Sequence, residues 1–210
     1  MIKFIVSHLD RNLLQNEART IAELSQKNTL FVIASGRQYG NLRRLFRAVA
    51  DQISYICENG ALVVHHNQII LKQSIPREIG IKLIEQILDC DGCEVFISGE
   101  NISYLIPKTE DYLIYIRDEL MNHVHVIKIL EEIGEEFLKI SLYRPQGISS
   151  QLKDSFVDQF QRQLKIAVAG NNWLYFTNLR TNKGEAIKVF QQYLSLLPDE
   201  MMGFWVRQMI

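Results

Sequence analysis

The stretch IKFIVSHLD, residues 2–10, joins a mainly apolar run to a short polar segment. A second stretch, TLFVIASGR (residues 29–37), has the same form and ends in a Ser-Gly-Arg tripeptide. Between them, residues 16–28 have the apolar spacing of an amphipathic helix. Apolar runs of this kind are typical of strands that are buried on both faces of a parallel sheet. The two stretches therefore predict a β-α-β unit.

The same pattern continues for one more repeat. Residues 39–53 read as a helix, and residues 54–61 (SYICENGA) as a third strand closed by an Asn-Gly turn. This β-α-β-α-β order predicts a parallel, doubly wound sheet, in which ligands bind at the carboxyl ends of the strands. The polar segments 7–10 and 35–37 fall at those ends, so we expect the functional site there.

After residue 61 the pattern changes to hairpins mixed with helices, which indicates an antiparallel α+β layer. Residues 61–73 form a hairpin with an expected Asn67-Gln68 turn. The later elements are expected as helix 76–90, strands 93–98 and 102–107, helix 109–122, strand 135–144, helix 149–164, and strands 165–170 and 172–178.

The last segment returns to the alternation of helix and apolar strand seen at the start of the chain. A helix begins near Asn182, and an apolar strand follows at residues 199–206. The fold class is therefore α/β. We expect a parallel core built from residues 1–78 and 179–210, with residues 79–178 inserted as a second α/β domain.

Composition bounds the function. The chain has 210 residues, of which 47% are hydrophobic, so it can bury the core of one large domain or two small ones. Its net charge of −1 and its isoelectric point of about 6.5 argue against a general nucleic-acid-binding protein. The sequence shows no apolar run of about 18 residues and no signal peptide. We expect a cytoplasmic protein with no nucleic-acid and no membrane partner.

The three cysteines, Cys57, Cys90 and Cys93, are an odd and sparse set, which is typical of a reducing compartment and not of a disulfide framework. Cys90 and Cys93 have the spacing of a zinc knuckle, but a structural zinc site needs four ligands. Cys57, His65 and His66 are the candidates for the others. Free thiols near a turn are the better interpretation.

Four short motifs resemble, in their order and spacing, those of a single family. They are FIVSHLDRNLL (4–14), FVIASGRQ (31–38), ENGALV (58–63) and NKGEAI (182–187). Together they resemble the Cof-type haloacid dehalogenase-like (HAD) phosphatases over nearly the whole chain. The resemblance implies a Rossmannoid core with an inserted cap. It also implies a magnesium-dependent phosphatase of small phosphorylated metabolites, such as sugar phosphates or cofactor phosphates, that works through an aspartyl-phosphate.

Carried over position by position, the resemblance assigns Ser35 and Gly36 to the phosphate-binding second motif, and Lys183 to the phosphate-binding lysine. Asp10 stands at the position of the general acid/base. His8, however, stands where the family has its nucleophilic aspartate.

Other positions also depart from the family's pattern. Arg11 and Asn12 replace a Gly-Thr pair, while the apolar residues Val206 and Ile210 stand where the fourth motif has acids. The resemblance implies Mg²⁺ held by the first aspartate, by the backbone carbonyl at Asp10 and by those acids. With the acids replaced, no complete set of metal ligands is predicted. The family normally continues past the position of Ile210, so we expect an incomplete core sheet.

We therefore expect catalysis to be lost or severely impaired, because loss of a covalent nucleophile alone typically lowers the rate by about 10⁴- to 10⁶-fold. Two alternatives are a pseudophosphatase that holds a phosphorylated ligand without turnover, and a truncated remnant that self-associates through its open sheet edge. His8 as a phosphohistidine nucleophile, or His8 and Asp10 as a transition-metal pair, also remain open.

Overall fold

The structure is a computed structural model that describes residues 1–8 and 17–204. The chain divides into two compact units. The core unit contains residues 1–72 and the segment from residue 181 onward, and the insertion unit contains residues 73–180. The insertion was expected at 79–178. Residues on both sides of that range bond within the insertion unit. The Ser74 carbonyl accepts from the Asn178 side-chain amide at 2.8 Å, and the Arg180 amide donates to the Asn178 side-chain oxygen at 3.0 Å.

The core unit is built on a six-stranded sheet with the order β12-β1-β2-β3-β4-β5. Its strands and helices are β1 (Phe4–His8), α1 (Glu17–Gln26), β2 (Leu30–Ala34), α2 (Tyr39–Leu45), β3 (Ile53–Cys57), β4 (Leu62–His65), β5 (Gln68–Lys72), α6 (Lys183–Tyr193) and β12 (Met201–Phe204). Strands β12, β1, β2 and β3 are parallel, whereas β3, β4 and β5 form antiparallel pairs. The predicted β-α-β-α-β order and α/β class are confirmed.

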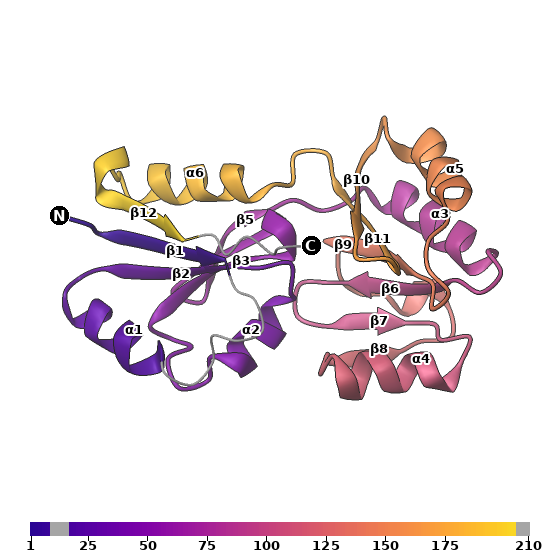
Figure 1. Cartoon of the computed structure of the whole chain (residues 1–210), viewed down its shortest axis with the longest axis horizontal. Coiled ribbons are helices and arrows are strands. Elements are labelled where there is room, and N and C mark those ends of the chain that lie inside the picture. Colours follow the sequence, from indigo (N-terminus) through magenta and orange to yellow (C-terminus); the bar gives the residue numbers. More distant parts are fainter. Residues whose placement is uncertain (9–16, 205–210) are drawn as a thin grey trace. The chain divides into compact units, whose positions relative to one another are not determined.

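Helix α6 covers one face of this sheet, and α1 and α2 cover the other (Figure 1). On the α6 face, Phe190 is fully buried and its ring lies 5.4 Å from that of Phe4 on β1. Alternate residues of β1 and β2 point to the same cluster because side chains on a strand alternate between its faces. The buried residues of this cluster are Phe4, Val6, Val32, Ala34, Ile56, Val63, Ala186 and Phe190.

Two elements of the core unit differ from the sequence prediction. The helix expected over residues 39–53 ends at Leu45, and residues 46–52 continue as successive turns. The hairpin turn expected at Asn67-Gln68 is formed by His66 and Asn67, whose φ angles are 46° and 62°. Positive φ at both central residues matches the right-handed twist of the paired strands.

Buried His65 gives the core unit a pH dependence that can be tested. Its Nδ1 lies 2.8 Å from the Ser54 hydroxyl. Burial, with a smaller contribution from His66, lowers the pKa of His65 below its usual value. The unfolded chain therefore takes up a proton near pH 6.5, the ordinary value for histidine, before the folded chain does. We expect the free energy of unfolding to fall as the pH decreases below about 6.5.

Urea unfolding followed through NMR signals of Ile53 and Val64, at about pH 7.5 and about pH 5.5, measures this effect within the core unit. The His65→Gln variant is expected to have a smaller pH dependence. The His66→Gln variant should keep most of it, because burial is the larger cause of the shift. An unchanged pH dependence in His65→Gln would contradict the assignment.

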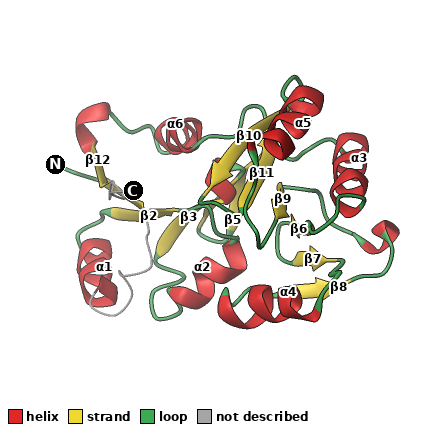
Figure 2. Ribbon diagram, turned by 45° about the vertical axis from the view of Figure 1, so that its right-hand side comes forward, coloured by secondary structure: helices red, strands yellow, loops and turns green. Residues whose placement is uncertain are grey.

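The insertion unit has its own six-stranded sheet with the order β10-β11-β9-β6-β7-β8. Its elements are α3 (Arg77–Leu88), β6 (Glu94–Ser98), β7 (Ser103–Leu105), α4 (Glu110–Ile114), β8 (Val124–Val126), β9 (Lys139–Tyr143), α5 (Ser150–Phe160), β10 (Leu164–Ala169) and β11 (Trp173–Asn178). All strand pairs are antiparallel except β7–β8. The α4 helix lies on the face opposite to α3 and α5 (Figure 2).

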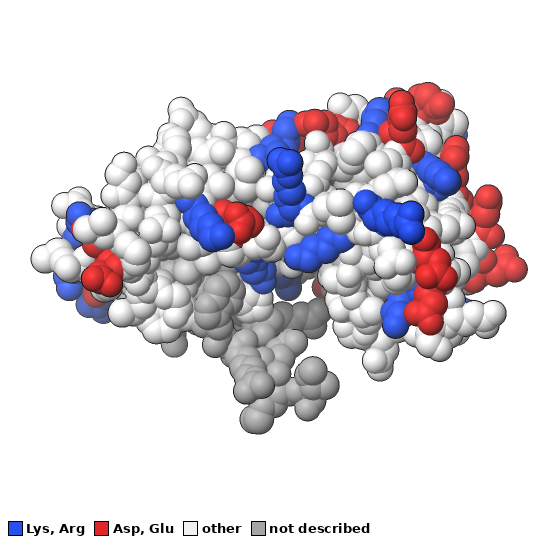
Figure 3. All heavy atoms as spheres, turned by 90° about the horizontal axis from the view of Figure 1, so that it is seen from above, with Lys and Arg blue, Asp and Glu red and all other residues white. Residues whose placement is uncertain are grey.

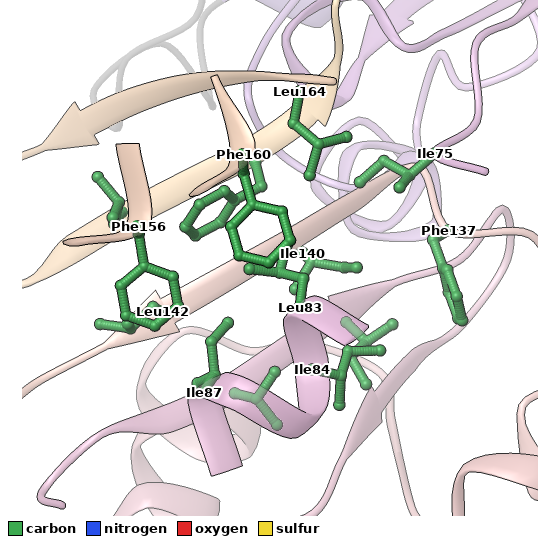
Figure 4. Close-up of a cluster of buried hydrophobic side chains, with 14 of the residues drawn as sticks. Ile75, Leu83, Ile84, Ile87, Phe137, Ile140, Leu142, Phe156, Phe160 and Leu164 are labelled. Carbon is green, nitrogen blue, oxygen red and sulfur yellow. The ribbon is translucent and has the colours of Figure 1, made fainter. Parts of the chain in front are cut away.

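The main core of the insertion unit lies between this sheet and helices α3 and α5. Leu83, Ile84 and Ile87 of α3 point toward the strands, and Phe156 and Phe160 of α5 complete the layer (Figure 4). These five side chains are at most 2% exposed. The 3.6-residue spacing of the apolar positions predicted both helices.

Strand β8 was not predicted, since it is short and pairs only with β7. The helix expected over residues 109–122 begins as predicted, with the Thr109 hydroxyl accepting from the amide of Tyr112 at 3.3 Å. It then passes at Tyr115–Glu119 into a π-helical turn.

Within the described ranges, no helix has the length and apolar character needed to cross a membrane.

Candidate functional site

The candidate site lies at the carboxyl ends of the parallel strands of the core unit. His8 is the last residue of β1 and pairs in register with Ala34, the last residue of β2. Parallel strands end at the same edge of a sheet, so His8 lies beside the segment that follows β2. That segment begins with Ser35 and Gly36, as the sequence predicted.

Hydrogen bonds fix Ser35 at this edge. Its side chain and backbone are 97% buried, and its amide donates to the carbonyl of Ile56 on β3 at 2.8 Å. The carbonyl of Ser35 accepts from the amide of Asn59 at 3.1 Å. The amide of Arg37 donates to the Ser35 hydroxyl at 3.2 Å, which leaves the hydroxyl hydrogen able to point to a further acceptor.

The turn that follows β3, Glu58–Gly60, connects the two predicted phosphate-binding segments. All three of its residues have positive φ angles, of 47°, 60° and 107°. A Cβ atom on Gly36 would lie 2.9 Å from the Asn59 side-chain oxygen. A Cβ atom on Gly60 would lie 2.5 Å from the carbonyl oxygen of Asn182 and 3.0 Å from the amide nitrogen of Lys183. One turn therefore packs closely against both segments.

Helix α6 begins at the other side of this turn. Asn182 is its N-cap, and the side-chain oxygen of Asn182 accepts from the amide of Glu185 at 2.8 Å. Lys183, the first residue of the helix, is half-buried. A helix N-terminus carries partial positive charge and unpaired amides, and a lysine beside it adds a full charge. This end of α6 is therefore suited to an anion.

The structure thus gathers four of the predicted site residues. It places His8, Ser35, Gly36 and Lys183 on the same edge of the core unit, through β1–β2 pairing and through the Glu58–Gly60 turn. The sequence predicted a turn at Asn59-Gly60 but did not show that it contacts residues 182 and 183. The other predicted site positions lie outside the described residues: Asp10, Arg11, Asn12, Val206 and Ile210.

The described part of the site does not fit the magnesium ion that the family implies. Mg²⁺ prefers octahedral oxygen ligands, usually including one or two carboxylates. At the end of β1 the described side chain is an imidazole, that of His8. Among residues 1–8 and 17–204, no group of three or more His, Cys, Asp or Glu side chains could hold a metal ion.

Comparison with known proteins agrees with this arrangement. The family described as haloacid dehalogenase-like hydrolase matches residues 8–204. The chain belongs to this family. It is 24% identical over 175 residues to 5-amino-6-(5-phospho-D-ribitylamino)uracil phosphatase YbjI of Escherichia coli (strain K12). That match covers 80% of this chain but only 62% of YbjI, so the chain spans less than two thirds of this relative.

Solved structures show the same fold over both units. TM0651 from Thermotoga maritima has a TM-score of 0.82 at 21% identity, and the match covers 99% of this chain and 81% of TM0651. The HAD subclass IIB sugar phosphatase BT4131 has a TM-score of 0.74 at 17% identity, with 96% and 79% covered. The predicted Cof-type HAD membership and the Rossmannoid core with an inserted cap are confirmed.

Proposed function

We propose that this chain binds the phosphate group of a small phosphorylated metabolite at the edge of the core unit where Ser35 and Lys183 lie. We propose further that it hydrolyses the ester very slowly or not at all. The observation that carries the proposal is the Glu58–Gly60 turn, which packs against both the Ser35–Gly36 segment and the start of α6. The groups suited to an anion are thereby held at one place, while His8 stands at the end of β1.

The chemistry of these groups suits a phosphate monoester. The Ser35 hydroxyl can donate to a phosphate oxygen, and the Lys183 ammonium can form a charge-assisted hydrogen bond. The core unit carries more Lys and Arg than Asp and Glu, whereas the insertion unit has the reverse balance. On the face shown in Figure 3, acidic side chains gather over the insertion unit at the right. An anionic ligand is thus attracted to the core unit.

His8 explains why turnover is expected to be absent. A carboxylate at this position would form an acyl-phosphate, and an imidazole cannot form that bond. Because the His8 side chain also does not supply the oxygen ligand that Mg²⁺ prefers, two parts of the family's chemistry are affected by one residue. Asp10, the acid/base by resemblance, would then have no covalent intermediate to hydrolyse.

Binding of inorganic phosphate tests the proposal without requiring turnover. Titration is followed by NMR and by calorimetry in wild type, Lys183→Ala and Lys188→Ala. Removing the charge-assisted hydrogen bond of Lys183 should weaken binding by about 10- to 100-fold. Lys188 is the matched control, because it lies on the same helix, is exposed and pairs with Glu185 at 2.7 Å. We expect Lys188→Ala to bind as wild type does.

Equal binding by wild type and Lys183→Ala, or no binding by either, would overturn the proposal. The organic part of the ligand can then be surveyed with phosphorylated sugars and with phosphoribityl compounds. The first class is taken from the description of BT4131 as a sugar phosphatase and the second from the name of YbjI. If one class binds more tightly than inorganic phosphate, that class is the kind of phosphorylated metabolite that the site accepts.

A further inference from the structure

A pair of cysteines in the insertion unit lies far along the chain from the candidate phosphate site. Cys90 and Cys93 occupy the two ends of a four-residue turn that connects α3 to β6. The amide of Cys93 donates to the carbonyl of Cys90 at 3.2 Å, and Gly92 closes the turn with a φ of 67°. A positive φ at the third position of a turn is suited to glycine. The backbone thereby directs both thiols to one side.

The two sulfur atoms are in contact. The Cys93 thiol donates to the Cys90 sulfur over 3.4 Å, so a disulfide bond of about 2.05 Å needs an approach of only about 1.4 Å. Both residues are free cysteines. A pair with two intervening residues is also the arrangement found in thiol–disulfide oxidoreductases.

The two thiols differ in their access to solvent. Cys93 is fully buried in the core of the insertion unit, whereas Cys90 is half-buried at its margin. Burial, together with the hydrogen bond to Cys90, raises the pKa of Cys93 to about 12. The Lys108 ammonium donates to the carbonyl of Cys90 at 2.8 Å and holds a positive charge next to the turn. Attack on a dissolved reagent must therefore begin at Cys90.

We propose that Cys90 and Cys93 form a reversible redox site that reacts with small disulfides of the glutathione class, with Cys90 as the attacking and Cys93 as the resolving thiol. This site is independent of the proposed phosphate-binding function. Among the described residues no further His, Cys, Asp or Glu completes a metal site around the pair. Two thiols in contact without such ligands are suited to forming a bond with each other.

The exchange is balanced in atoms and electrons. The Cys90 thiolate attacks one sulfur of the small disulfide, whose S–S bond breaks and releases one thiolate. The Cys93 sulfur then attacks the Cys90 sulfur of the mixed disulfide, and the second small thiolate leaves. The two protons lost by the cysteines are taken up by the two released thiolates. The protein dithiol is oxidised, and the small disulfide is reduced to two thiols.

The test uses the reduced full-length chain in mixtures of glutathione and glutathione disulfide. Samples are quenched with acid, the remaining thiols are alkylated, and the peptide that contains both cysteines is measured by mass spectrometry. With an increasing share of glutathione disulfide, we expect this peptide to lose two hydrogen atoms and both alkylation sites. Cys57 is buried in the core unit and should stay a free thiol at every ratio, so that it is alkylated once the quenched chain is unfolded.

Variants assign the two roles. In Cys93→Ala and in Cys93→Ser, the reaction should end at a glutathione adduct on Cys90. The same result with two different replacements would separate loss of the resolving thiol from a local packing defect. Cys90→Ser should react at least about tenfold more slowly, because its remaining thiol is buried and protonated. Cys57→Ser is the control and should form the Cys90–Cys93 bond at the wild-type rate.

Two results would overturn the proposal. One is the persistence of three alkylated cysteines at every ratio of glutathione to its disulfide. The other is a glutathione adduct on Cys93 of the Cys90→Ser variant that forms at the wild-type rate, since it would show that the buried thiol needs no partner to react.

Discussion

Hydrolysis of an aryl phosphate by the wild-type chain is expected to match a buffer blank, with magnesium or with EDTA. The physical reason is the side chain at the end of β1, where His8 cannot form the acyl-phosphate of the family's mechanism. Loss of a covalent nucleophile lowers turnover by about 10⁴- to 10⁶-fold, which would hide the reaction under the uncatalysed background. The assay measures release of the phenol over hours with each metal condition.

Restoring the carboxylate alone is not expected to restore turnover. In His8→Asp, the new carboxylate stands close in sequence to Asp10 and, by resemblance, the acids that would help to hold a cation are replaced at Val206 and Ile210. Two carboxylates close together without a cation raise the pKa of one of them, so the pair is partly protonated. Arg11 adds a positive charge where the family has glycine. Better activity is expected when Arg11→Gly and Val206→Asp are added to His8→Asp.

Three outcomes would contradict these expectations. A clear wild-type rate that is abolished by EDTA and by Asp10→Asn would show that the family's mechanism persists. Strong activity of the single His8→Asp variant would show that the fourth motif is dispensable. A third outcome, an acid-labile phosphate on wild-type His8 that is absent in His8→Asn, would support the phosphohistidine route instead.

The sequence predicted most of the core unit because its strands are buried on both faces. Strands β1 and β2 appear as apolar runs bounded by polar residues, and their order with intervening helices dictates a parallel sheet. Local signals also predicted the N-cap of α6 at Asn182, since asparagine accepts from a helix amide at that position. Such features depend on neighbouring residues alone, and a single sequence contains them.

Other features depend on contacts that periodicity does not encode. The apolar spacing beyond Leu45 resembles a helix, but Phe46 and Val49 are buried through a series of turns. The hairpin turn lies at His66-Asn67, one residue before the predicted position, because neither Asn-Gln nor His-Asn is a strong turn signal. In the segment after Leu45, tertiary packing outweighed the local preference for helix, whereas at the hairpin the local signal was too weak to fix the turn.

The candidate site also combines features that the sequence predicted with features that only the folded chain shows. Motif resemblance named Ser35 and Lys183, and pairing of β1 with β2 brought His8 to their edge. The contact of Gly60 with Asn182 joins two positions separated by the whole insertion unit, and no spacing along the chain predicts it. The Asn-Gly dipeptide indicated a turn. Only the folded core unit shows that this turn supports the start of α6.

Gly60→Ala is expected to cause the largest loss of stability in the core unit. Gly60 has a φ of 107°, and an added Cβ would lie 2.5 Å from the Asn182 carbonyl oxygen and 2.6 Å from its carbon. These are backbone atoms, so no side-chain rotation can relieve the contact. Backbone strain alone contributes on the order of 1–3 kcal/mol, and displacement of α6 adds to it. Phosphate binding should be lost with the position of Lys183.

Hydrogen–deuterium exchange distinguishes this local effect from general unfolding. In Gly60→Ala, amides of β3 and of the first turn of α6 should exchange faster, while amides of the insertion-unit core, such as β6 and β9, keep their protection. Gly134→Ala is the matched control, because its added methyl group would meet no atom within 4 Å. If Gly60→Ala retained wild-type protection and wild-type phosphate affinity, the Glu58–Gly60 turn would not be the element that positions Lys183, and the proposed binding site would lose its structural basis.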